Sequence, residues 1–130
     1  MNNPVYLLQS GQKLNSSKFC RYLGRKIQKT AKQFNLKIDH KKIYCLDDAA
    51  IDVICGLMNN KPIELKKSAF IFCLRKELEL YAKLRKLKIK FIEYKGLKKE
   101  IKNMLDVMEN KHKEIKYSIV KAQQQVVLMN

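Results

Sequence analysis

The residues of this chain best suited to chemistry are two adjacent carboxylates, Asp47 and Asp48. They follow a short predicted strand at residues 42–46 and open a predicted helix at residues 47–58. In α/β sheets ligands bind beyond the carboxyl ends of the strands, where carboxylates can hold Mg²⁺ among nucleotide phosphates. A local alternative also fits, because Asp47 at this position caps a helix and Asp48 stabilises its first turn. Both interpretations stay open.

Thiols and imidazoles do not form a recognisable metal pattern. The four cysteines are Cys20, Cys45, Cys55 and Cys73, and none are paired at Cys-x-x-Cys spacing. Three of them lie in apolar stretches, as buried free thiols do, and free thiols fit a reducing cytosol. The two histidines are isolated from cysteines and from each other. The sequence therefore predicts no metal site.

Basic residues dominate the charged surface. The chain carries 28 Lys and Arg against 12 Asp and Glu, a formal charge of +16. Such an excess favours an acidic partner, most often RNA, although a solvated lysine-rich surface is the alternative. Helical spacing places one group of cations opposite the apolar residues of a predicted helix at residues 18–35, and later groups follow. The candidate RNA-binding residues are Lys18, Arg21, Arg25, Lys29, Lys32, Arg85, Lys86, Lys98, Lys99 and Lys102.

Strands are predicted to alternate with helices. Further helices are predicted at residues 75–87, 97–109 and 114–127, and further strands at 68–74 and 88–93. Residues 4–9 fit either a strand or an extended arm, and Ser16 or Ser17 is expected to cap the first helix. Alternating strands and helices favour an α/β fold with a parallel sheet flanked by helices. We expect an arm at residues 1–17 and one α/β domain at 18–130.

No apolar run approaches the ~20 residues that cross a bilayer. The first residues also lack the basic-then-apolar pattern of a secretory signal. These features predict a cytoplasmic protein without a membrane partner.

Three segments carry a resemblance to a known family. They are Leu46-Asp47-Asp48-Ala49-Ala50, Lys76-Glu77-Leu78-Glu79-Leu80-Tyr81-Ala82 and Glu114-Ile115-Lys116-Tyr117-Ser118-Ile119-Val120. In order and spacing they resemble the C-terminal half of the PP-loop ATP pyrophosphatases that thiolate tRNA, the 2-thiouridine and 2-thiocytidine synthetases. The resemblance runs from about residue 17 to residue 122. It implies part of a Rossmann-like, adenine nucleotide α-hydrolase-like sheet with C-terminal helices, and a family activity of ATP-dependent tRNA sulfur transfer.

The residues that perform the family's chemistry are replaced. Its Ser-Gly-Gly-Lys-Asp-Ser loop is absent from the sequence, and Ile43-Tyr44 stands where the family has Gly-His. Cys20 matches the second cysteine of the family's cluster, but Ser17 and Tyr94 replace the first and third. One thiolate cannot hold an iron–sulfur cluster, so Cys20 is interpreted as vestigial. The resemblance then implies no cofactor, with ATP and Mg²⁺ bound only if a separate chain supplies the PP-loop.

Three functions remain open. The favoured one is a protein inactive on its own that binds tRNA or another RNA, a partner subunit, or both. The second is the C-terminal subunit of a split thiolation enzyme, completed by a PP-loop chain. The third is a basic RNA- or ribosome-binding protein unrelated to thiolation. A sheet edge left without its neighbour would favour a homodimer or a partner chain.

Overall fold

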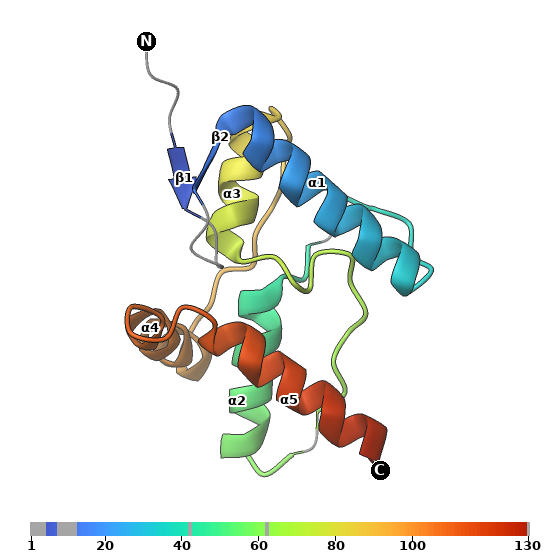
Figure 1. The fold of residues 1–130 in the computed structure, drawn as a ribbon. Helices are drawn as coiled ribbons and strands as arrows, with labels where there is room; N and C mark the ends of the chain where they lie inside the picture. The colour runs from blue at the N-terminus through green and yellow to red at the C-terminus, as the bar shows by residue number, and fades with distance from the viewer. Residues whose placement is uncertain (1–4, 8–12, 42, 62, 130) are drawn as a thin grey trace. The chain divides into compact units, whose positions relative to one another are not determined.

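The computed structural model describes residues 5–7, 13–41, 43–61 and 63–129, most of them helical (Figure 1). The elements are β1 (Val5–Leu7), β2 (Lys13–Asn15), α1 (Ser16–Gln33), α2 (Leu46–Met58), α3 (Arg75–Leu84), α4 (Leu97–Glu109) and α5 (Ile115–Met129). They group into two compact units. The first unit comprises Met1–Cys45 and Lys67–Phe91, and the second comprises Leu46–Lys66 and Ile92–Asn130. The predicted boundary between an arm at 1–17 and a domain at 18–130 stays a prediction.

The predicted α/β fold with a parallel sheet is wrong. Among the described residues the strands form one two-stranded antiparallel sheet, in which Val5 of β1 faces Asn15 of β2. Residues 43–45 and 88–93 have no strand partner, and residues 69–73 form turns and a bend, with the Cys73 amide donating to the Phe70 carbonyl (3.0 Å). Most of the apolar run at 68–74 is buried in turns rather than in a strand. The prediction failed because a short apolar run fits either structure, and burial alone does not distinguish them. The expectation of an unpaired edge in that segment loses its basis.

The first unit is built on α1, which lies beside α3 (Figure 1). Its buried residues Phe19, Leu23 and Ile27 recur at helical spacing and join Phe70 and Leu78 in the core. The predicted cap is displaced by a residue or two. Asn15 caps the helix through its side-chain oxygen, which accepts from the Lys18 amide at 2.9 Å, while the expected caps Ser16 and Ser17 lie inside the first turn.

The second unit is built on α2, which contacts both α4 and α5. All residues from Leu46 to Ile51 are buried, so the first half of this helix is buried on more than one side, as predicted. Leu57 and Met58, also expected to be buried, are exposed at its C-terminal end. Asp47 lies within the helix rather than at its cap.

The amphipathic pattern of α4 predicts the right helix but too wide a buried stripe. Ile101 and Leu105 are buried, whereas Leu97, Met104 and Met108, also expected inward, are 36%, 46% and 38% exposed. In α5, Ile115 and Ile119 are half-buried, Ala122 is exposed, and the side chain of Val126 lies outside the described residues. No helix in the described part of the chain is both long enough and apolar enough to span a membrane.

Candidate nucleic-acid interface

The basic face of α1 forms where the sequence places it. Phe19, Leu23 and Ile27 hold one side of the helix in the core, so the residues on the opposite side face solvent. The five predicted cations of this helix are all exposed: Lys18, Arg21, Arg25, Lys29 and Lys32. Their spacing along a rigid helix is suited to successive phosphates of a nucleic-acid backbone.

Four of these cations line a groove of about 560 Å³, which we call the basic groove. Its lining residues are Leu14, Lys18, Arg21, Tyr22, Arg25, Lys26 and Lys29. The sequence analysis missed Tyr22 and Lys26, which lie one helical turn apart, with the Lys26 ammonium 5.9 Å from the centroid of the Tyr22 ring. The i,i+4 spacing of these two residues on a predicted helix could have indicated the pair from the sequence. Tyr22 adds an aromatic surface to a site that is otherwise cationic.

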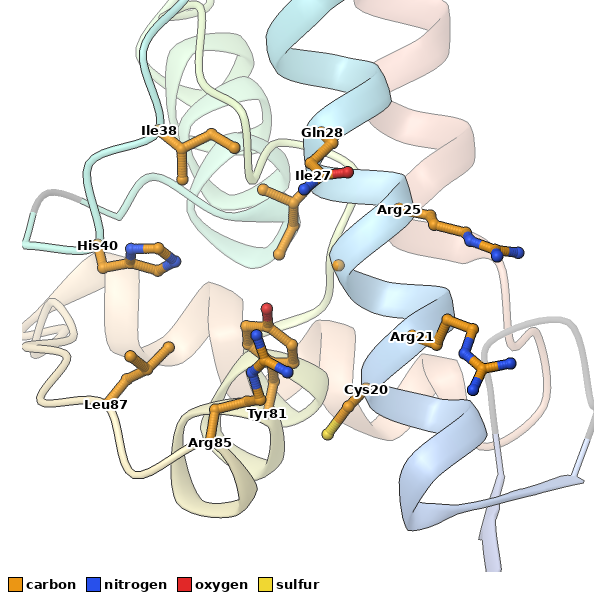
Figure 2. A pocket seen from close by; sticks show the side chains of 11 residues that line it. Cys20, Arg21, Arg25, Ile27, Gln28, Ile38, His40, Tyr81, Arg85 and Leu87 are labelled. Atoms are coloured by element: carbon orange, nitrogen blue, oxygen red, sulfur yellow. The ribbon is translucent and has the colours of Figure 1, made fainter.

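A second concavity of the first unit, about 370 Å³, shares Arg21 and Arg25 with the basic groove (Figure 2). We call it the arginine pocket. Its lining residues are Cys20, Arg21, Gly24, Arg25, Ile27, Gln28, Ile38, His40, Tyr81, Arg85 and Leu87. The structure therefore brings the predicted residue Arg85 of the α3 C-terminus together with two cations of α1. Lys86 is exposed in the turn that follows α3.

Arg85 is placed by an aromatic neighbour. Its guanidinium carbon lies 5.8 Å from the centroid of the Tyr81 ring, a cation–π distance. Tyr81 is only 6% exposed, so a fixed ring supports the guanidinium. The pocket thus combines an oriented cation with the apolar side chains of Ile27, Ile38 and Leu87.

The predicted cations of α4 lie in the second unit. Lys98 is 3.3 Å from a carboxylate oxygen of Asp52, and Lys102 is 2.7 Å from one of Asp106. Lys99 is exposed on the same helix. Because Lys98 and Lys102 already have carboxylate partners, phosphate binding there would compete with ion pairs inside the protein.

The acidic pair is buried and engaged. Asp47 and Asp48 are 4% and 5% exposed. The Lys116 ammonium donates to Asp47 Oδ2 at 2.8 Å, and the Tyr94 hydroxyl donates to Asp48 Oδ1. A cation supplied by the chain itself therefore occupies the place beside Asp47 where a metal ion would bind. The proposed role of the pair in holding a nucleotide or Mg²⁺ stays a prediction.

Lys116 is the centre of a buried ionic cluster in the second unit. Besides Asp47, its ammonium lies 2.7 Å from Asp106 Oδ1 and 3.4 Å from Glu109 Oε2. Burial lowers the pKa of Lys116, but the charge of Asp47 and hydrogen bonds to Asp106 and Asp47 outweigh it and hold that pKa above 10.5. Burial likewise raises the pKa of Asp106, but Lys102 and Lys116 outweigh it and hold that pKa below 3.8. Lys116 and Asp106 therefore stay ionised at neutral pH.

The cysteines do not fit an iron–sulfur cluster. Cys45 and Cys73 are each 1% exposed within the apolar core of the first unit, and burial raises the pKa of Cys73 to about 12. Cluster ligands must be thiolates, so such a group is unsuited to iron. The hydroxyl of Tyr94 donates to Asp48. Among the described residues, no three His, Cys, Asp or Glu side chains gather as a metal site.

No protein-family model matches the chain. No curated protein matches it either. A similar solved structure is the U34-tRNA thiolase NcsA from Methanococcus maripaludis with its 4Fe-4S cluster, at a TM-score of 0.52 and 21% sequence identity. The similarity covers 87% of this chain but only 44% of the thiolase. At this identity the likeness concerns the fold alone.

Proposed function

We propose that this chain is a tRNA-modification-related protein without catalytic activity of its own, and that it binds tRNA or another RNA through the basic groove. The observation that carries the proposal is the row of exposed cations on α1, held outward by the burial of Phe19, Leu23 and Ile27. The fold similarity to a tRNA thiolase supports tRNA as the RNA. Recognition rests on phosphate geometry and RNA shape, because cations on phosphates carry no sequence information.

The chain lacks or has altered the groups that such catalysis would need. ATP pyrophosphatase chemistry requires backbone amides that cradle phosphates, and the sequence contains no Ser-Gly-Gly-Lys-Asp-Ser loop to supply them. Asp47 is paired with Lys116, and no three His, Cys, Asp or Glu side chains of the described residues gather as a metal site. ATP-dependent pyrophosphate release by the purified chain, abolished by Asp47→Ala, would contradict this part of the proposal.

The test is a salt titration of binding to tRNA and to an unstructured RNA of equal length. Changing Arg21, Arg25 and Lys29 to Glu should weaken binding at least tenfold and reduce the log–log salt slope by roughly 0.7–0.9 for each phosphate that is no longer neutralised. The matched control changes Lys111, Lys113 and Lys121 to Glu, which alters the net charge equally at exposed positions of the second unit. Equal weakening in both triple variants would show that net charge, and not the basic groove, binds the RNA.

A second candidate function is a subunit completed by a PP-loop chain. It is favoured by the outer face of α4, where Leu97, Met104, Val107 and Met108 are 36–67% exposed. Exposed apolar stripes on a helix mark contact surfaces, and this chain spans less than half of the thiolase. Co-purification of a PP-loop chain with the wild type, abolished in Val107→Glu but kept in Lys99→Glu, would support it. A homodimer that dissociates in Val107→Glu would instead assign this face to a second copy.

A further inference from the structure

We propose that the arginine pocket receives one unstacked base of the bound RNA, while the adjoining phosphates lie along the basic groove. The inference rests on the proposed RNA-binding function and names the part of the RNA that the first unit holds. Its basis is the junction of two concavities at Arg21 and Arg25, one lined mainly by Lys and Arg side chains and one lined by a mixture of polar and apolar side chains.

The interior of the pocket suits a flat, partly polar ring. Figure 2 shows Ile38, His40 and Leu87 facing α1 across the pocket, with Tyr81 and Arg85 between Leu87 and α1. Bases stack on guanidinium planes as well as on aromatic rings, and Arg85 is held by Tyr81. The imidazole of His40 and the amide of Gln28 provide hydrogen-bonding groups for a base edge.

The size of the pocket depends on a residue without a side chain. A Cβ on Gly24 would lie 3.5 Å from the Tyr81 hydroxyl, which is ordinary van der Waals contact. Alanine therefore fits at this position, whereas a longer side chain would extend into the pocket. The volume of about 370 Å³ is at the lower end of the range for small-molecule sites. A single base fits this description better than a stacked run of bases.

Arg21 and Arg25 connect the base to the backbone. Both line the pocket and the basic groove, and in Figure 2 their side chains extend from α1 away from Ile38 and His40. A nucleotide whose base entered the pocket would keep its phosphates beside these two guanidinium groups. Arginine is suited to this position because its fork binds phosphate oxygens in pairs.

The experiment uses a short single-stranded RNA with one 2-aminopurine, whose fluorescence rises when it leaves the stack, and the same RNA with an abasic site. With the wild type we expect fluorescence to rise on binding, and the abasic RNA to bind about tenfold more weakly, as expected when one base no longer stacks. Gly24→Met should abolish the rise and the preference. Gly24→Ala controls for the helix, and Lys83→Gln, at an exposed position of α3 outside both concavities, is the charge-matched control for Arg85→Gln.

A second measurement does not require a folded Gly24→Met variant. Cys20 lines the pocket, so bound RNA should slow its alkylation several-fold while leaving the rate at Cys55 of the second unit unchanged. Salt-sensitive RNA binding with no fluorescence rise, no abasic effect and no protection of Cys20 would overturn the base pocket and leave the RNA-binding function standing. Absence of RNA binding, with mononucleotides still protecting Cys20, would overturn both and indicate a free-nucleotide site.

Discussion

At the residue scale, Lys116 is the side chain on which the second unit most depends. The residue is 3% exposed, and its ammonium is bonded to Asp47, a residue 69 positions earlier in the chain. Burying a charge is costly unless it is paired, so the lysine and the carboxylates around it require one another. Within the acidic pair, Lys116 neutralises Asp47, whereas Asp48 accepts from the Tyr94 hydroxyl.

Lys116→Met should lower the free energy of unfolding by about 3–5 kcal/mol, because the buried carboxylate of Asp47 would be left uncompensated. Urea denaturation measures the change. Lys121→Met, at an exposed position of the same helix, is the control and should stay within about 0.5 kcal/mol of the wild type. Combining Lys116→Met with Asp47→Asn should cost less than the sum of the single changes, and strict additivity would contradict a direct pair.

The same cluster predicts how stability varies with pH. The pKa of Asp106 is held below 3.8, so its contribution is present above that pH and is lost as the pH falls through the folded-state value. The pKa of Lys116 is held above 10.5, so its contribution is complete below that pH and is lost as the pH rises through the folded-state value. The free energy of unfolding, measured in urea, should be constant around neutral pH and should decrease at alkaline pH. In Lys116→Met the alkaline decrease should be smaller. If the alkaline decrease in that variant equalled that of the wild type, titrating groups other than Lys116 would cause it.

At the scale of elements, all five helices are predictable from the sequence, whereas the three strands predicted after residue 41 do not form among the described residues. Helices are recognised by apolar spacing over several turns, as in Phe19, Leu23 and Ile27, which also fixes the phase of the basic face. A short apolar run such as 68–74 carries no period and fits a turn as well as a strand. The partners of Asp47 and Asp48 could not be predicted because Lys116 and Tyr94 are distant in sequence.

Two helical glycines differ in the space available for a side chain, so alanine at each should have opposite effects on stability. Gly24 of α1 has room for a Cβ, so Gly24→Ala should raise the free energy of unfolding by about 0.5–1 kcal/mol through helix propensity. A Cβ on Gly56 of α2 would lie 2.9 Å from the Lys61 carbonyl oxygen and would also clash with Ile63. The chain folds back there, with the Lys61 amide donating to the Gly56 carbonyl (2.9 Å).

Gly56→Ala should therefore lower the free energy of unfolding by about 1–3 kcal/mol despite the gain in propensity. Thermal or urea unfolding of both alanine variants tests the pair of signs. Stabilisation by both alanine variants would show that the turn after α2 relaxes around a methyl group.

At the scale of the whole molecule, the charge of +16 acts in opposite ways on folding and on binding. Like charges repel in the compact state and destabilise it, and salt screens that repulsion. RNA binding also depends on these charges, but salt weakens it because the release of counterions into a saltier solution is less favourable. The free protein and the RNA complex should therefore respond to salt with opposite signs.

Raising the salt from about 0.05 to 0.5 M should increase the Tm of the free chain and decrease the gain in Tm that tRNA gives. At low salt, RNA at about 100 times its Kd should stabilise the fold by about 2.7 kcal/mol, since a ligand that prefers the folded state stabilises it by mass action. Thermal unfolding with and without tRNA at both salt concentrations gives the four Tm values that this comparison needs. The variant with Glu at positions 21, 25 and 29 should have a higher Tm than the wild type in low salt without RNA, because its net charge is lower, and should gain little from tRNA. A wild-type gain that is independent of salt would show that the bound RNA is held by contacts other than the cations of α1.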